Sequence, residues 1–143
     1  MAPLLVRAAH PQPAADHHPG SYYFTDVSTS SPHDDDIGTL YESGITHGVT
    51  ATTYDPEGEV TRQQMASFLV RAANLHPAAD HHPGSYYFTD VSSTSPHDDD
   101  VGTLSESSVT KGCDANDPAL YCPAADVLRD QMAAFLARAF LGY

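Results

Sequence analysis

The sequence predicts a mainly α-helical fold built from helix–loop–helix repeats. Residues 13–28 and 77–92 are letter for letter the same stretch, displaced by 64 positions. Apolar residues recur at helical spacing after both stretches, and residues typical of helix starts and stops bracket those segments. A fixed displacement of this kind is the signature of a repeat architecture. We therefore interpret the chain as two full units preceded by one leading helix.

The first helix of each unit is predicted from the sequence Ser-Pro-His-Asp. Ser31 offers a cap oxygen, and Pro32 suits the first helical position. The helix is expected from about Pro32 to Ser43, with Gly44 as its left-handed stop. Its apolar stripe consists of Ile37, Leu40 and Tyr41. The second unit repeats this helix over Pro96 to Ser107.

The second helix of each unit follows a loop rich in Gly and Thr. Thr61-x-x-Gln64 is a capping box. Met65, Phe68, Leu69 and Ala72 then fall on one helical face. We expect this helix to end at Asn74. Its copy is expected over Leu128 to Leu141, where Leu128 lacks the cap hydroxyl.

The duplication defines the predicted domain organisation. Residues 1–12 fit the register of the second helix, so the chain is interpreted as opening inside the last helix of an earlier repeat and as a fragment or processed product of a longer polypeptide. Residues 13–76 form one repeat, and residues 77–143 form the other. Pro-, Ala- and His-rich linkers over residues 11–20 and 77–84 are expected to run extended over the surface.

Composition excludes several classes of partner. The 143 residues are 41% hydrophobic, enough for one compact domain. Six basic against 19 acidic residues give a net charge of −13, which repels nucleic acid and anionic lipid heads. No apolar run approaches the ~20 residues of a spanning helix, so membrane insertion is not expected. Protonation of the nine histidines in mild acid would reduce this negative charge.

Several motifs occur together in a fixed order, and they carry a resemblance. The first unit contains Phe24-Thr25-Asp26-Val27, Gly44-Ile45-Thr46-x-Gly48, Tyr54-Asp55-Pro56 and Val60-Thr61-Arg62-Gln63-Gln64-Met65-Ala66-x-Phe68-Leu69. This series resembles the S-layer homology repeat over nearly the whole chain. The second copy, with Gly112-Cys113, Tyr121-Cys122-Pro123 and Arg129-Asp130-Gln131-Met132, is similar to the variant of actinobacterial surface proteins.

The resemblance implies a fold, a location and a binding function. It implies helical repeats, typically three to a pseudo-three-fold bundle. It also implies binding of secondary cell-wall polysaccharide, by which exported proteins are held on the bacterial surface. The Thr-Arg-Ala-Glu motif associated with glycan binding stands here as Thr61-Arg62-Gln63-Gln64 and as Leu128-Arg129-Asp130-Gln131.

The arginines occupy two phases of the repeat. Arg62 and Arg129 open the second helix, where they and the free amides would attract an anionic group such as a carboxylate-bearing sugar. The alternative is that each pairs with a nearby Asp or a loop carbonyl to fix the turn. Arg7, Arg71 and Arg138 lie near the end of that helix, where a cation complements the helix dipole.

Aromatic residues precede each first helix. Phe24 and Phe88 are predicted core anchors. Two pairs of tyrosines would either stack on sugar rings or cover the neighbouring repeat. These are Tyr22, Tyr23, Tyr86 and Tyr87.

Two cysteines, Cys113 and Cys122, have no cysteine counterparts in the first unit, where Val49 and Asp55 stand. Their joint absence there favours a disulfide, which suits an oxidising, exported setting. A thiol nucleophile or a two-cysteine metal site is the alternative, although neither has an evident base or further ligands.

Acidic runs beside histidines are weak metal candidates. They are His33 with Asp34 and His97 with Asp98. Acids in a first helical turn also complement the helix dipole without any metal. The Asp-His-His sequences at 16–18 and 80–82 are a second candidate. We expect no metal and no cofactor.

Together these observations predict a non-catalytic, extracellular module of the cell wall. The sequence contains no phosphate loop, nucleophile elbow or His-Glu-x-x-His, so no enzyme activity is expected. The first hypothesis is that the module anchors an exported protein to cell-wall polysaccharide. The alternative is a structural protein whose repeats self-assemble into a surface layer or filament without binding glycan.

Overall fold

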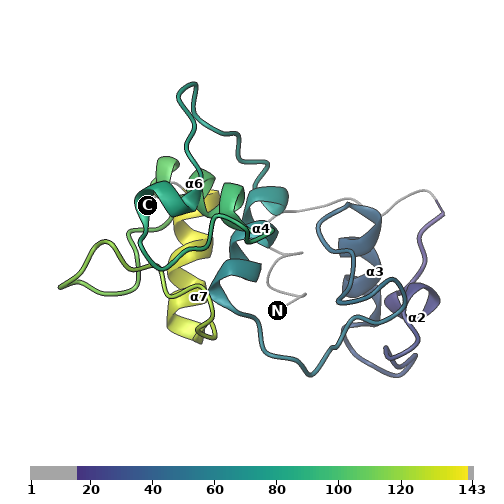
Figure 1. Ribbon diagram of the computed structural model, residues 1–143. Helices are drawn as coiled ribbons and strands as arrows, with labels where there is room; N and C mark the ends of the chain where they lie inside the picture. The colour runs from purple at the N-terminus through teal and green to yellow at the C-terminus, as the bar shows by residue number, and fades with distance from the viewer. Residues whose placement is uncertain (1–15, 142–143) are drawn as a thin grey trace. The chain divides into compact units, whose positions relative to one another are not determined.

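A computed structural model of the chain describes residues 16–141, apart from the side chain of Arg129 (Figure 1). This part of the chain is helical and contains no strand, which confirms the predicted mainly α fold. Its elements are α2 (Gly20–Tyr23), α3 (Asp34–Glu42), α4 (Arg62–Ala72), α5 (Gly84–Tyr87), α6 (Asp98–Glu106), α7 (Arg129–Leu136) and the π-helical turn η1 (Ala137–Leu141). The predicted leading helix over 1–12, with Arg7, lies outside the described residues.

The predicted helix stops agree with the structure, but the predicted start of the first helix does not. α3 begins at Asp34 rather than Pro32, and its N-cap residue His33 makes no side-chain cap hydrogen bond. In α4, Thr61 accepts from the amide of Gln64 and the Gln64 side chain accepts from the amide of Thr61, which completes the capping box. Gly44 follows α3 with φ +72°, and Asn74 follows α4 with φ +51°. Both left-handed residues end their helices. The predicted stop positions are confirmed.

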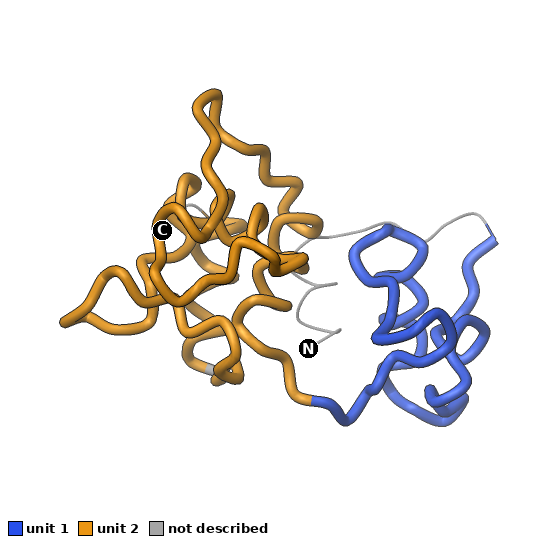
Figure 2. The backbone as a smooth tube through the Cα atoms, in the orientation of Figure 1, with its two compact units in different colours: residues 1–58 blue, residues 59–143 orange. Residues whose placement is uncertain are grey.

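The chain divides into two compact units, 1–58 and 59–143 (Figure 2). The division falls before α4 because α4 packs against α6 of the second repeat. A helix of the first repeat therefore belongs to the core of unit 2. The predicted repeat boundary between 76 and 77 describes the duplicated sequence and stays a prediction.

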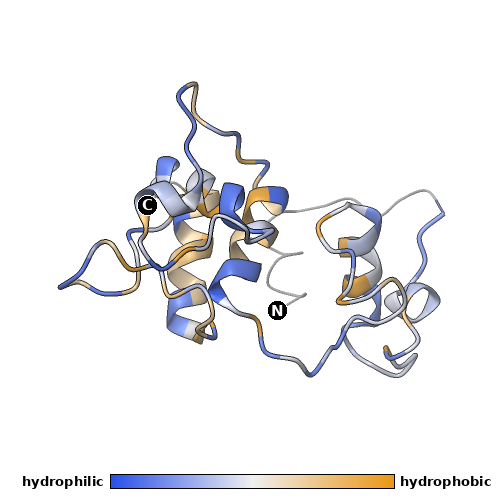
Figure 3. Cartoon of the chain, viewed as in Figure 1, coloured by the Kyte–Doolittle hydropathy of each residue, from blue (hydrophilic) through white to orange (hydrophobic). Residues whose placement is uncertain are grey.

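Each unit has its own apolar core, and Figure 3 shows apolar residues along the helices with mostly hydrophilic loops between them. The core of unit 1 contains Phe24, Val27, Ile37, Leu40 and Ile45. The core of unit 2 contains Met65, Leu69, Phe88, Val101, Leu104, Val109, Tyr121, Met132 and Phe135. Burial of Phe24 and Phe88 confirms the predicted anchors. No helix within residues 16–141 is long and apolar enough to cross a membrane.

Candidate functional site

The linkers are not simply extended over the surface, because each packs against the first helix of its repeat. Residues 77–80 are exposed, but 81–83 are half-buried. A Cβ atom at Gly102 of α6 would lie 2.1 Å from the carbonyl oxygen of His82, and one at Gly38 of α3 would lie 2.0 Å from that of His18. Glycine at these two positions therefore permits the linker to contact the helix.

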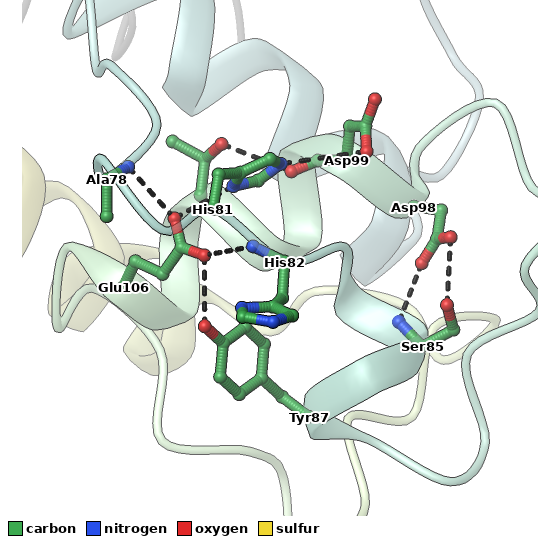
Figure 4. Close-up of polar contacts among 9 residues, drawn as sticks. Ala78, His81, His82, Ser85, Tyr87, Asp98, Asp99 and Glu106 are labelled. Atoms are coloured by element: carbon green, nitrogen blue, oxygen red, sulfur yellow. Dashed lines mark hydrogen bonds and ion pairs between the residues drawn. The ribbon is translucent and has the colours of Figure 1, made fainter.

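A buried carboxylate fixes the second linker. Glu106 ends α6, and its side chain is only 8% exposed. It accepts hydrogen bonds from His81 Nδ1 at 2.8 Å, from the amides of His82 and Ala78 at 2.7 and 3.1 Å, and from the Tyr87 hydroxyl at 3.0 Å. We call His81, His82, Tyr87 and Glu106 the Glu106 cluster (Figure 4). His81 Nε2 also lies 3.6 Å from Asp99.

The first repeat contains the same arrangement, which we call the Glu42 cluster: His17, His18, Tyr23 and Glu42. Glu42 ends α3 and accepts from His17 Nδ1 at 2.7 Å, from the amide of His18 at 2.6 Å and from the Tyr23 hydroxyl at 2.9 Å. The second nitrogen of His17 lies 3.7 Å from Asp35. The two clusters agree within about 0.1 Å in each shared contact, consistent with their identical local sequence.

These contacts shift the acid–base equilibria of both clusters. Hydrogen bonds from the amide of His18 and from the His17 side chain lower the pKa of Glu42 to about 2. Burial alone would raise the pKa of Glu106, but hydrogen bonds from His81, His82 and Ala78 outweigh it and lower that pKa to about 2. The carboxylates in turn raise the pKa of His17 and His81 above 6.5. Both pairs are therefore ionised in mild acid.

One tyrosine of each predicted pair is exposed to solvent and stacks on a histidine ring. Tyr22 stacks on His18 with ring centroids 4.0 Å apart, and Tyr86 stacks on His82 at the same distance. Tyr22 and Tyr86 are each 66% exposed. We call these two stacks the tyrosine platforms. Tyr23 and Tyr87 are half-buried, with their hydroxyls bonded to the cluster carboxylates. Sugar contacts by these four tyrosines stay a prediction.

Arg62 occupies an internal position rather than an open pocket. It is 3% exposed, and its Nε donates to the carbonyl oxygen of Tyr121 at 2.7 Å. The guanidinium carbon lies 4.9 Å from the Tyr121 ring and 5.0 Å from the Phe135 ring. These partners match the loop-carbonyl alternative left open by the sequence, while a glycan-binding role for Arg62 stays a prediction. Arg129 begins α7, and its side chain lies outside the described structure.

The acidic runs hold the short helices in place. Asp34 accepts from the amide and hydroxyl of Ser21 at 2.6 and 2.9 Å, and Asp98 does the same with Ser85 at 2.7 and 3.0 Å. His33 is exposed. Across residues 16–141, no group of three His, Cys, Asp or Glu side chains is arranged to hold a metal ion.

His97 instead belongs to the contact between α4 and α6. Its Nδ1 lies 2.7 Å from the hydroxyl of Ser67, which donates to Asp100 at 2.6 Å. Burial lowers the pKa of His97 below 6.5. Hence the two histidines predicted as equivalent weak ligands, His33 and His97, have different surroundings.

A disulfide joins Cys113 to Cys122, with Cα atoms 6.0 Å apart. This confirms the predicted pairing. It closes the loop that gained three residues relative to the first repeat.

Sequence reasoning missed Glu42 and Glu106, the residues that organise both clusters. A glutamate at the end of a short helix is ordinarily solvated, so no local signal marked them. The available signal was their position in the duplication: both follow the identical Asp-His-His sequence at the same distance.

Comparison with known proteins relates the chain to a surface protein family. Residues 23–66 match the S-layer homology domain. The chain is 30% identical over 120 residues to the surface-layer 125 kDa protein of Lysinibacillus sphaericus, covering 83% of this chain and 10% of that protein. The chain thus spans about a tenth of the length of this relative. The predicted resemblance is confirmed, and both findings indicate an extracellular location at the cell surface.

Proposed function

We propose that this chain, which carries S-layer homology sequence, is a non-catalytic module that anchors an exported protein to cell-wall polysaccharide. The comparisons support a wall-anchoring module of the cell surface at the level of the family. The polymer it binds, the residues that touch the polymer and the lack of catalysis are parts of the proposal. Arg129 is retained as a predicted glycan contact because it stands in the family's glycan-binding motif.

The observation that carries the proposal is the pair of tyrosine platforms. The two tyrosines lie in the identical segments 13–28 and 77–92, and they have the same exposed fraction and the same stacking distance on a histidine. A large ring held rigidly in solvent costs little further ordering when a ligand binds. Such a ring offers an apolar face for the C–H face of a sugar and a hydroxyl for hydrogen bonding.

The negative charge of the chain favours binding through stacking of the tyrosine rings on sugar faces over binding through attraction of an anionic group. The chain carries a net charge of −13, so a strongly anionic polymer would be repelled at low ionic strength. Salt screens that repulsion. We therefore expect wall binding to be maintained or strengthened when salt is added.

The cluster carboxylates support the non-catalytic part of the proposal. A general acid or base works best with a pKa near the operating pH. Hydrogen bonds hold the pKa of Glu42 and Glu106 at about 2. The donors are backbone amides and histidines of the linkers and the tyrosine hydroxyls of the short helices α2 and α5. These carboxylates therefore act as structural acceptors.

Co-sedimentation with purified wall sacculi tests the proposal. The wild-type chain should pellet, and Tyr22→Ala/Tyr86→Ala should reduce the bound fraction by about tenfold or more, since stacking on two exposed rings is lost. Tyr22→Phe/Tyr86→Phe keeps both rings and should retain most of the binding.

Leu141→Ala is the matched control, because Leu141 is 69% exposed and lies on η1, away from both platforms in sequence. It should pellet as the wild type does. Circular dichroism checks that every variant is folded. Failure of the folded wild-type chain to pellet at any salt concentration would overturn the anchoring proposal.

A further inference from the structure

Each tyrosine platform is assembled from two separate segments of the chain. In the first repeat the linker supplies His18 and the short helix α2 supplies Tyr22, with ring centroids 4.0 Å apart and an interplanar angle of 27°. In the second repeat His82 and Tyr86 of α5 stack at the same distance and at 25°. A helix of four residues has little stability of its own. The stack therefore depends on whatever fixes both segments to the rest of the repeat.

In the first repeat, a single carboxylate oxygen holds both segments. Glu42 Oε1 accepts from the backbone amide of His18 at 2.6 Å and from the Tyr23 hydroxyl at 2.9 Å. The first donor belongs to the residue that carries the histidine ring, and the second belongs to the direct neighbour of Tyr22 in α2. Glu42 Oε2 accepts from His17 Nδ1 at 2.7 Å, which adds a second bond to the linker. The end of α3 thus joins the linker to α2 at one side chain.

The second repeat uses the same atoms, and Figure 4 shows them. Glu106 Oε1 accepts from the amide of His82 at 2.7 Å and from the Tyr87 hydroxyl at 3.0 Å. Its Oε2 accepts from His81 Nδ1 at 2.8 Å and from the amide of Ala78 at 3.1 Å. Both cluster carboxylates are only 8% exposed. Their oxygens are therefore occupied by donors of the chain itself.

The tyrosine that bonds the carboxylate also contacts the exposed ring. Tyr23 packs edge-on against Tyr22, with centroids 5.1 Å apart at 85°, and edge-on against His18 at 6.2 Å. Tyr86 and Tyr87 meet at 5.1 Å and 85° as well. A hydrogen bond that fixes the hydroxyl of the half-buried tyrosine therefore also restricts the position of the exposed one.

We infer that Glu42 and Glu106 are positioning residues for the tyrosine platforms: each keeps the histidine and tyrosine rings of one platform stacked without touching the sugar. A ring that is already ordered loses little freedom when a ligand binds, so this support increases affinity. The effect on wall binding rests on the proposed function, whereas the effect on the stack does not. The two effects can therefore be measured separately.

Nuclear magnetic resonance of the complete 143-residue chain measures the stack. A histidine ring that lies on the face of a tyrosine has its proton resonances displaced upfield, and Tyr22→Ala gives the undisplaced position for His18. Glu42→Ala should move the His18 resonances toward that position and leave those of His82 unchanged. Glu106→Ala should do the reverse.

Glutamine is the matched substitution, because Glu42→Gln removes the same charge as Glu42→Ala but keeps one carbonyl oxygen for the His18 amide and the Tyr23 hydroxyl. It should retain the upfield displacement. Asp35→Ala removes an acidic side chain of α3 that is 85% exposed and lies 3.7 Å from His17 Nε2, and it should leave the His18 resonances in place. Tyr23→Phe, which removes only the hydroxyl, is the second variant if Glu42→Ala fails to fold. It should move the His18 resonances in the same direction by a smaller amount.

Co-sedimentation with wall sacculi measures the consequence for binding. Glu42→Ala/Glu106→Ala should weaken binding by about threefold or more, because the rings must then be ordered at each binding event. Glu42→Gln/Glu106→Gln should bind nearly as the wild type does. In a chain that already carries Tyr22→Ala/Tyr86→Ala, the alanine substitutions at the two carboxylates should cause no further loss, since residues that act through one contact are not additive.

Four results would overturn the inference. The first is a set of His18 resonances that Glu42→Ala and Tyr23→Phe leave in place. The second is glutamine variants that lose the stack as fully as the alanine variants do. The third is a further loss of binding when the carboxylate substitutions are added to the platform substitutions. The fourth is loss of wall binding in the platform variants alone, which would keep the proposed function and reject the positioning role.

Failure of the wild-type chain to pellet has a different meaning. It would overturn the proposed function, and the resonances of His18 and His82 would then decide by themselves whether the two carboxylates position the rings.

Discussion

We call residues 48–58 of unit 1 the Tyr54 loop and residues 112–125 of unit 2 the Tyr121 loop. In each loop two backbone amides donate to one aspartate, Asp26 or Asp90, but the two loops differ in what they enclose. The Tyr121 loop surrounds Arg62 and is closed by the Cys113–Cys122 disulfide. The Tyr54 loop has neither feature among the described residues. The Glu42 and Glu106 clusters, by contrast, match in every contact that both contain. The comparison teaches that the identical segments fix the local geometry of both repeats, whereas the divergent loops differ in what they enclose.

The largest expected effect on stability comes from removing the Arg62 side chain from the Tyr121 loop. Arg62→Ala should lower the free energy of unfolding by about 3 kcal/mol, because hydrogen bonds from a buried cation and its contacts with two rings are lost. Denaturant unfolding followed by circular dichroism measures the change. Arg138→Ala is the control: its one described bond, to the Val109 carbonyl at 3.2 Å, should be worth about 1 kcal/mol. Equal losses in the two variants would contradict the assigned role of Arg62.

Opening the disulfide should affect one loop and spare the other. Cys113→Ser/Cys122→Ser should cost about 2–3 kcal/mol, the loop-closure entropy of a segment of this length. Hydrogen exchange measured by mass spectrometry should show faster exchange in residues 112–125 and little change in residues 48–58. Equal acceleration in both loops would show that they are not independent.

How far the sequence predicts this comparison depends on how local the signal is. The capping box of Thr61, the left-handed stops at Gly44 and Asn74, and the anchor Phe24 were predicted because each depends on neighbours in the chain. The short helices α2 and α5 were missed because four residues between proline and phenylalanine carry no helical period.

The candidate sites were predicted less well than the helices. Burial of Arg62 depends on Tyr121, which is 59 positions away, and no periodicity reports a contact of that separation. Glu42 and Glu106 were missed for the same reason, since their donors lie in a linker that composition alone describes as solvated. The sequence duplication indicated that these segments matter for the fold, but it did not show which side chains are in contact.

The two clusters should respond alike to pH, which tests their equivalence. Glu42 and Glu106 have a lowered pKa, so their contribution to stability is present above about pH 4.5 and is lost as pH falls toward 2. His17 and His81 have a raised pKa, so theirs is present below pH 6.5 and is lost as pH rises through the raised value. Both clusters should therefore be most stabilising between about pH 4.5 and 6.5.

The experiment compares melting temperatures across pH for the wild type, Glu42→Gln and Glu106→Gln. Each variant should melt lower than the wild type, by the largest margin inside that window.

His97 acts in the opposite direction: its pKa is lowered, so its contribution to stability is present above pH 6.5 and declines in acid. His97→Asn should therefore shift the optimum toward lower pH. A wild-type optimum above pH 8 would contradict the assigned pairs.

The smallest expected effect distinguishes the two second helices by their caps. Thr61 completes the capping box of α4. Leu128 is 60% exposed and has no oxygen to offer the amide of Gln131, which donates to the Asp130 carboxylate at 2.8 Å instead. Thr61→Ala should cost about 1 kcal/mol, whereas Leu128→Thr should gain at most about 0.5 kcal/mol because the amide of Gln131 already has an acceptor. Denaturant unfolding measures both changes. A larger stability change at Leu128 than at Thr61 would contradict this comparison of the two caps.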